Sequence, residues 1–170
     1  VKNNDIILAV PSSGLHSNGY SLVRNILKNK KTNKIKKSRL NLKKELIKPT
    51  KIYVREVNKL IEKKLINGCA NITGGGLLNN LIRVIPNKLG ININLSKIKI
   101  KKIFKWLKKN NISDIEMMNT FNCGVGFCLI VNKKNIRKIQ KFFSKKYQPY
   151  EIGFVLKSTS RIKTIGKMQW

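Results

Sequence analysis

Two glycine-bearing turns, each between an apolar segment and an amphipathic one, constrain this chain more than any other feature. The first turn runs from Ser12 to Tyr20, and the second runs from Thr73 to Gly76. In both cases the apolar segment predicts a strand and the periodic segment after the turn predicts a helix. Polar groups therefore gather where a strand ends and a helix begins, which is a favourable place for an anion.

Hydrophobic periodicity along the chain predicts strands and helices that do not alternate strictly, so we expect an α+β domain with a mixed β-sheet packed with α-helices. The expected strands are 5–10, 69–73, 91–95, 124–131, 150–156 and 161–165 at an edge. One helix is expected after Ser17 or Asn18 as N-cap, and another after Thr50 with Tyr53, Val57, Leu60 and Ile61 facing inward. Further helices are expected around 77–82, 100–107 and 136–143, and a short one where Ser113 and Glu116 are spaced as a capping box. Residues 28–44 show little periodicity and are predicted to be an exposed, mobile connection.

The chain has 170 residues, enough for a single domain over 1–170. Because it begins at Val1 and enters a strand almost at once, we expect it to be part of a longer protein. No apolar run is long enough to cross a bilayer, and no signal peptide opens the sequence. The three cysteines form no CxxC pair, so we expect small apolar residues in a reducing cytoplasm, without a membrane partner.

The formal net charge of +30 suggests nucleic acid as a partner, but the composition argues against specific binding. The basic residues are 31 lysines and only 6 arginines, although arginine is the preferred bidentate reader of phosphate and guanine. Isoleucine and asparagine are also abundant, a pattern that A/T-rich codon usage produces. We therefore expect no specific nucleic-acid partner, and only nonspecific adhesion to polyanions.

The first turn combines hydroxyl, amide and imidazole groups with glycines that let a ligand approach the backbone. The candidate anion-binding residues are Ser12, Ser13, Gly14, Ser17 and Asn18. His16, the only histidine, is able to exchange a proton near neutral pH if its pKa is ordinary. The alternative is a serine-rich turn whose hydroxyls cap the next helix, with His16 as a bystander.

Thr73, Gly74, Gly75 and Gly76 form the second turn, and three consecutive glycines are costly in conformational entropy. Either a tight strand-to-helix connection or a backbone cradle for a phosphate would require them. The third glycine-bearing segment is 120–126; either its glycines allow close backbone packing, or Thr120 or Asn122 contacts a ligand. The seven acidic residues are too scattered for a metal site, so we expect no metal ligands in this chain.

The string from Ser12 to Arg24 closely resembles the opening of the C-terminal domain in the aminoimidazole ribonucleotide synthetase family, also called phosphoribosylformylglycinamidine cyclo-ligases. Further matches follow in the right order at 49–54, 72–78, 83–86, 120–126 and 152–153. The chain departs from the family pattern at Asn71 and Asn119, where histidine and arginine are common, and at Asn79 and 81–82.

The resemblance implies the C-terminal-domain fold of the PurM superfamily, with a partly ferredoxin-like topology. It also implies ATP-dependent closure of the imidazole ring of formylglycinamidine ribonucleotide in purine biosynthesis. ATP and Mg²⁺ would be held mainly by an N-terminal domain missing from this chain. Through the same N-terminal domain, two copies would form a homodimer. Thr73 and the three glycines would bind the substrate's phosphate. The loop at 12–18 would line the cleft, with Thr120 and Asn122 beside it. His16 would make a catalytic or transition-state contact.

Two other readings remain open. In the first, the chain belongs to another enzyme of the same superfamily: a formylglycinamidine synthase half, a selenophosphate synthetase or a thiamine-phosphate kinase. The intact strings at 12–19 and 73–76 favour the cyclo-ligase. The charge alone motivates the second reading, a noncatalytic basic module that binds nucleic acid.

Overall fold

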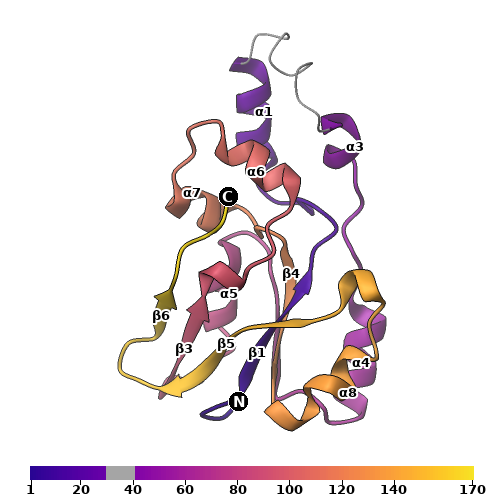
Figure 1. The fold of residues 1–170 in the computed structure, drawn as a ribbon, viewed down its shortest axis with the longest axis vertical. Helices are drawn as coiled ribbons and strands as arrows, with labels where there is room; N and C mark the ends of the chain where they lie inside the picture. The colour runs from indigo at the N-terminus through magenta and orange to yellow at the C-terminus, as the bar shows by residue number, and fades with distance from the viewer. Residues whose placement is uncertain (30–40) are drawn as a thin grey trace.

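A computed structural model describes residues 1–29 and 41–170, which form a six-stranded sheet with helices on both faces (Figure 1). The strands lie in the order β2-β4-β1-β5-β3-β6, and every neighbouring pair is antiparallel except β3 and β6. The strands are β1 (Ile6–Pro11), β2 (Gly68–Asn71), β3 (Leu89–Asn94), β4 (Val125–Val131), β5 (Tyr150–Lys157) and β6 (Ile162–Ile165). The expected mixed sheet is confirmed.

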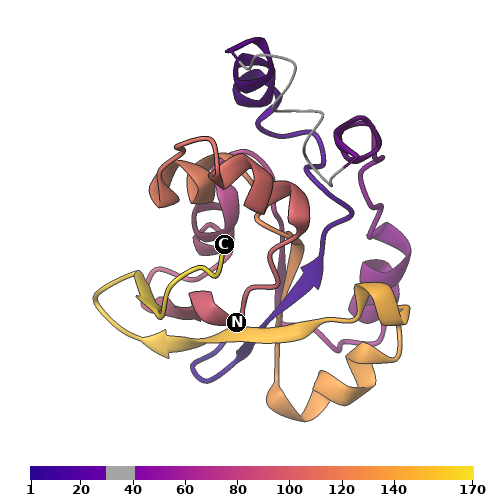
Figure 2. The same ribbon diagram turned by 45° about the horizontal axis from the view of Figure 1, so that its top comes forward.

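The helices separate into two groups. Figure 1 and Figure 2 show α5, α6 and α7 on one side of the strands and α4 and α8 on the other, with α1 and α3 beyond one end of the sheet. Their bounds are α1 (Tyr20–Asn29), α3 (Leu42–Leu46), α4 (Val54–Glu62), α5 (Gly76–Ile82), α6 (Lys102–Lys108), α7 (Asp114–Thr120) and α8 (Ile136–Gln140). Short 3₁₀ turns span Leu95–Lys97, Lys133–Asn135 and Lys145–Tyr147.

Strand β1 lies inside the sheet and is apolar on both faces. Ile7 and Ala9 belong to the core beneath α5, α6 and α7, whereas Leu8 and Val10 belong to the core beneath α4 and α8. All four side chains are fully buried. Because both faces are covered, β1 reads as a continuous apolar run rather than an alternating one.

The sheet topology places both glycine-bearing turns at the same end of the sheet, where β1 and β2 finish. Strands β1 and β2 flank β4 and are both antiparallel to it, so they run in the same direction. Pro11 at the end of β1 pairs with Val125, and Asn71 at the end of β2 pairs with Phe127. The two turns therefore leave the sheet on either side of the start of β4.

Most expected elements are present, and several of their boundaries differ. Helix α1 begins at Tyr20, later than a cap at Ser17 or Asn18 predicts, and the Gly19 carbonyl accepts the hydrogen bond of Val23 N–H. Ile61 is 53% exposed, because α4 turns only the stripe that includes Val57 and Leu60 toward the sheet. The Ser113 cap is confirmed: its side chain accepts from Glu116 N–H.

Two expected segments are shorter than predicted. Strand β2 ends at Asn71, because the Thr73 carbonyl turns inward to accept a hydrogen bond from Gly76 N–H. Helix α8 ends at Gln140 rather than near residue 143. The expected mobile connection at 28–44 is wrong at its ends, where Lys28 lies in α1 and Leu42–Leu46 forms α3 capped by Asn41; its middle lies outside the described residues.

Within 1–29 and 41–170, no helix combines the length and apolar character that crossing a bilayer requires. The three cysteines are free thiols; Cys123 and Cys128 are buried and Cys69 is half-buried. Burial raises the pKa of the Cys123 thiol to about 12, so this side chain behaves as a small apolar residue.

Candidate functional site

The two turns meet in the folded chain. A Cβ atom placed on Gly74 would lie 3.9 Å from Asn18 Oδ1. On the other side of the first turn, Ser17 Oγ lies 3.4 Å from Thr50 Oγ1. The loop at 12–19, called here the first loop, therefore lies between the glycine turn at 73–76 and the segment at 49–52. Polar groups from three distant parts of the sequence form one surface.

Buried hydrogen bonds hold the first loop from beneath. Asn122 is fully buried, and its amide nitrogen donates to the carbonyls of Gly14 and Leu15 at 3.0 and 3.1 Å. Its Oδ1 accepts from Gly124 N–H, whose own carbonyl accepts from Ser12 N–H. Asn122 thus fixes the loop backbone from below, which is a positioning role, whereas Thr120 is half-buried at the end of α7.

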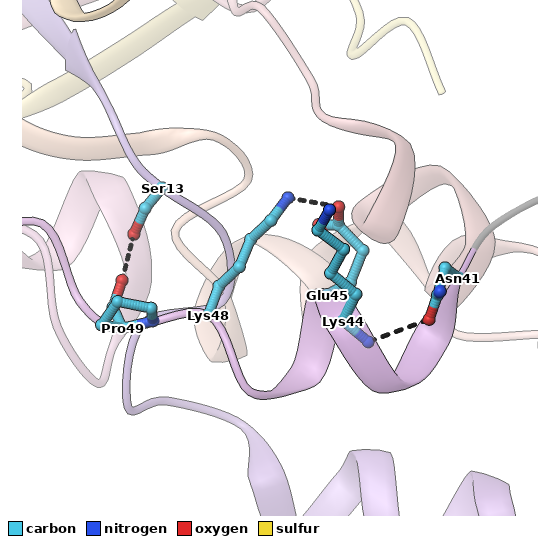
Figure 3. A network of polar contacts seen from close by, with 6 residues as sticks. All are labelled: Ser13, Asn41, Lys44, Glu45, Lys48 and Pro49. Carbon is cyan, nitrogen blue, oxygen red and sulfur yellow. Dashed lines mark hydrogen bonds and ion pairs between the residues drawn. The ribbon is translucent and has the colours of Figure 1, made fainter.

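The hydroxyl groups of the first loop have different surroundings. Ser12 is fully buried, and its Oγ has no hydrogen-bond partner among residues 1–29 and 41–170. Ser13 Oγ donates to the Pro49 carbonyl at 2.7 Å, as Figure 3 shows, and so connects the loop to the segment at 49–52. Ser13 is half-buried and Ser17 is exposed. The two outer hydroxyls therefore face the region where the turns and the 49–52 segment meet.

His16 lies inside the loop rather than on its surface. Its side chain is only 6% exposed, and its backbone adopts a left-handed φ of 58°. The Nε2 atom accepts a hydrogen bond from Ser13 N–H at 3.1 Å. Tyr53, whose hydroxyl donates to the Pro11 carbonyl, packs 6.2 Å from the imidazole centroid. A Cβ on Gly126 would lie 2.6 Å from His16 Cε1, so this glycine makes room for the ring.

The expectation that His16 exchanges a proton near neutral pH is wrong. Burial, and secondarily the positive charge of Lys101, lowers the pKa of His16 to about 4. The imidazole is therefore neutral at pH 7. Since Nε2 accepts a hydrogen bond, the proton of the neutral ring resides on Nδ1, which makes His16 a hydrogen-bond donor at that atom.

Titration of His16 is directly measurable because the chain has one histidine. We expect its ring resonances in NMR to titrate with a midpoint below pH 5. Because the unfolded chain takes up this proton near pH 6.5 and the folded chain only near pH 4, the free energy of unfolding should fall as pH decreases through that window. The loss should approach about 3 kcal/mol. A His16→Asn variant should lose this component, and a midpoint near 6.5 would contradict the burial argument.

Two positions in the glycine turn have a backbone conformation that favours glycine. Gly75 has a φ of +92° and precedes α5, and Gly76 has a φ of +71°. A Cβ on Gly76 would also overlap the carbonyl oxygen of Met118 in α7. Gly74, by contrast, is exposed, and a Cβ atom there would make only an ordinary contact with Asn18 Oδ1 at 3.9 Å. The tight-turn explanation for the glycines therefore holds at Gly76, whereas Gly74 faces the first loop.

One buried asparagine organises the glycine turn. Asn80 Nδ2 lies 3.2, 3.1 and 2.7 Å from the carbonyl oxygens of Thr73, Gly74 and Gly76. Its Oδ1 accepts from Thr73 Oγ1 at 3.2 Å. The Asn80 side chain thus holds the carbonyl oxygens of the glycine turn on its own side. Sequence reasoning missed Asn80, because an asparagine inside a helical stripe carries no signal of its own.

Sequence reasoning also gave no role to the segment at 49–52, although it belongs to the family resemblance. It separates two pockets, of about 540 and 280 Å³. The smaller pocket includes Asn71, Tyr53 and Phe127. Asn71, the position where the family commonly has histidine, therefore lies beside the candidate site. The larger pocket opens beside Ser13.

The described residues offer no ready magnesium site. Across 1–29 and 41–170, no three side chains of the His, Cys, Asp and Glu types come together as metal ligands would. Glu45 and Glu56, the carboxylates of the segments around the larger pocket, are occupied by ion pairs with Lys48 and Lys51. These residues do not fit a divalent cation.

The mixed six-stranded sheet with two glycine-bearing turns at one end defines the class of domain, and comparison with known families identifies that class. Residues 2–164 match the family described as "AIR synthase related protein, C-terminal domain", and the chain belongs to this family. Among its relatives are phosphoribosylformylglycinamidine cyclo-ligases from Prochlorococcus marinus NATL2A, 40% identical over 95% of the chain, and Alkaliphilus oremlandii, 42% identical over 80%. A third, from Clostridium perfringens, is 41% identical over 91%. These alignments cover 49%, 41% and 46% of the relatives, so the chain spans about half their length.

Solved structures confirm the fold. The chain is similar to a HypE–HypF complex chain with a TM-score of 0.63, at 18% identity over 97% of this chain and 51% of that one. It is also similar to thiamine monophosphate kinase from Aquifex aeolicus, with a TM-score of 0.58, at 18% identity over 99% and 52%. T. maritima PurL complexed with ADP has a TM-score of 0.57, at 10% identity over 98% and 23%. At these identities the likeness supports the architecture alone.

Proposed function

We propose that this chain is the C-terminal part of an ATP-dependent cyclo-ligase that converts formylglycinamidine ribonucleotide to aminoimidazole ribonucleotide in purine biosynthesis. The observation that carries the proposal is the meeting of the first loop and the glycine turn at Asn18 and Gly74, in a chain of this family. The relatives that bear the cyclo-ligase name are about twice as long, so the complete activity would need residues beyond this chain.

The glycine turn is the proposed site for the substrate's phosphate. Asn80 turns three carbonyl oxygens inward, so an anion on the outer side would meet amide hydrogens rather than oxygen lone pairs. The seven-residue helix α5 is short, so the local N–H groups of Gly74 and Gly75 matter more than the helix dipole. Thr73 and Asn18 would add side-chain contacts.

The first loop would line the reaction cleft with Ser12, Ser13, Gly14 and Ser17. His16 contributes as a neutral imidazole that donates a hydrogen bond from Nδ1, since its lowered pKa rules out a protonated ring near pH 7. Such a donor stabilises negative charge that develops on an oxygen during ring closure. Thr120 and Asn122 would support the loop from the side of α7 and β4.

ATP is the proposed co-substrate, and Mg²⁺ would accompany it on ligands outside this chain. Related folds are known with nucleotides: T. maritima PurL complexed with ADP, and the thiamine monophosphate kinase complexed with AMPPCP and TMP. We further propose a homodimer joined through the preceding domain, a cytoplasmic location, and no specific nucleic-acid or membrane partner. Low identity to the kinase and to PurL leaves those activities as weaker alternatives.

The test joins this chain to the N-terminal half of a cyclo-ligase relative and measures ATP-dependent formation of aminoimidazole ribonucleotide. We expect turnover by the fusion and none by the 170-residue chain alone. His16→Asn tolerates the left-handed backbone but loses the imidazole donor, so kcat should fall about a hundredfold.

The matched pair for the glycine turn is Gly75→Asn and Gly75→Asp, which share size and tolerate a positive φ but differ in charge. We expect the aspartate to raise KM for the ribonucleotide far more than the asparagine does. A fusion that turns over normally with both His16→Asn and Gly75→Asp would overturn the site assignment.

A further inference from the structure

Tyr53 is a buried aromatic residue beside His16 to which the proposed reaction gives no role. It is only 5% exposed and lies at the N-terminal end of α4. Its backbone carbonyl accepts a hydrogen bond from Val57 N–H in the first turn of that helix. The side chain therefore reaches the first loop from a fixed point at the end of a helix.

Several contacts hold the Tyr53 side chain in one place. Its hydroxyl donates to the Pro11 carbonyl at 2.8 Å, at the point where β1 ends and the first loop begins. The Phe127 ring lies 5.3 Å from the Tyr53 ring between centroids, and Lys51 Nζ lies 5.5 Å from the Tyr53 centroid. A Cβ atom on Gly126 would overlap the Tyr53 hydroxyl, so the glycine in β4 provides the space that this side chain occupies.

The imidazole of His16 needs a second constraint besides its hydrogen bond. The bond from Ser13 N–H fixes Nε2 at 3.1 Å but leaves the ring able to tilt about that atom. The Tyr53 ring, 6.2 Å away between centroids and inclined at 55°, limits this tilt. Because the Gly126 position also lies close to His16 Cε1, both rings share the space that the missing side chain leaves. Tyr53 thus restricts the imidazole and keeps water from one side of it.

The Tyr53 hydroxyl is a permanent hydrogen-bond donor. Burial, and then the neighbouring Tyr147 and Glu56, raises the pKa of this phenol well above its usual range. The group therefore stays protonated near pH 7, and its bond to the Pro11 carbonyl persists. A phenol of this kind does not exchange a proton during the reaction, so its contribution is to hold its neighbours.

We propose that Tyr53 is a positioning residue for His16, whose neutral imidazole it keeps buried and in one orientation, with Nδ1 as the donor. That this orientation serves ring closure rests on the proposed function; that Tyr53 sets the orientation and burial of His16 does not. Tyr53 also lines the smaller pocket together with Asn71 and Phe127. The same ring therefore forms part of the pocket wall and contacts the imidazole.

The first test is the NMR titration of His16 in variants of the 170-residue chain. Tyr53→Leu removes the ring, so the midpoint should rise by about one pH unit, because burial is the main cause of the lowered pKa of His16. Tyr53→Phe keeps the ring but loses the bond to Pro11, and we expect a smaller rise of about half a unit. Tyr20→Phe is the matched control: it also removes a hydroxyl that donates to a backbone carbonyl, that of Leu46, and should leave the midpoint unchanged.

Urea unfolding of each variant shows which of them remain folded. An unchanged midpoint in folded Tyr53→Leu would overturn the proposal, as would an equal shift in Tyr20→Phe. If Tyr53→Leu does not fold, Tyr53→Phe decides in its place, and an unchanged midpoint there has the same meaning. A variant that loses stability without a change at His16 would show that Tyr53 only packs.

The second test is kinetic and uses the fusion with the N-terminal half of a relative. Tyr53→Phe should lower kcat about tenfold and leave KM within about twofold, because a tilted donor impairs the reaction rather than binding. In a His16→Asn background the same change should cost no further activity, since Tyr53 acts through the imidazole. Fully additive losses would overturn the positioning role. A parent fusion without turnover would overturn the proposed function instead, and the titration would still decide whether Tyr53 sets the state of His16.

Discussion

Gly76→Ala should destabilise the chain by about 4 kcal/mol. The new methyl group would require a residue with a side chain to hold a φ of +71°, which costs roughly 1–2 kcal/mol. It would also overlap the Met118 carbonyl oxygen, which belongs to the backbone of α7 and is unable to move alone. Helices α5 and α7 would have to separate, and overpacking of this kind adds roughly 1–3 kcal/mol. Urea unfolding followed by tryptophan fluorescence measures the loss as a lower midpoint.

Gly74→Ala is the matched control because it places the same methyl group two residues away in the same turn. The nearest heavy atom would be Asn18 Oδ1 at 3.9 Å, an ordinary contact distance. We expect a change in the free energy of unfolding of less than about 1 kcal/mol. Equal midpoints for Gly74→Ala and Gly76→Ala would mean that the close approach of α7 does not constrain the turn.

Asn80→Leu should destabilise the chain by about 3 kcal/mol and disorder the glycine turn. Leucine has a similar size but neither donates nor accepts hydrogen bonds, so the three carbonyls that Asn80 holds lose this partner. The bond to the Gly76 carbonyl is buried, and each hydrogen bond lost in this way costs roughly 0.5–1.5 kcal/mol. Amide hydrogen exchange at Gly74 and Gly75 should accelerate along with the lower urea midpoint.

Charge distinguishes the role of Asn80 from simple packing. Asn80→Asp keeps the shape but points a carboxylate at three carbonyl oxygens, so it should be more destabilising at pH 7 than Asn80→Leu. Asn79→Asp is the control, because Asn79 is the neighbouring residue and is exposed. Should Asn80→Asp and Asn79→Asp unfold at the same urea concentration, the carbonyl clamp would not exist.

Local patterns predicted the elements around the site well. The apolar run that became β1 is buried on both sides, and the stripe with Leu77 and Leu81 faces the core as expected. The cap at Ser113 also followed from spacing alone, because a capping bond joins residues three apart. The exposure of Ile61 was predicted wrongly, since it depends on which face of α4 the sheet covers. The start of α1 at Tyr20 also differs from the prediction, because the Gly19 carbonyl accepts from Val23 N–H.

The ionisation of His16 and the role of Asn80 could not be predicted from local sequence patterns. The pKa of His16 depends on burial by the first loop and on the charge of Lys101, a residue far away in the sequence. Asn80 acts on carbonyls that only the folded turn brings within its reach. The larger pocket, of about 540 Å³, likewise draws Ser13, Lys51 and Lys146 from three separate segments.

The amino-acid sequence by itself determined the positions of the two glycine-bearing turns, the strand or helix beside each, and the family to which they belong, because backbone conformation and hydrophobic period are local properties. Only the tertiary structure decided that the turns meet. Strands β1 and β2 both pair antiparallel with β4, and this long-range pairing brings their C-terminal ends to the same end of the sheet. Distances, burial and charge at the site follow from that pairing, which no local sequence pattern encodes.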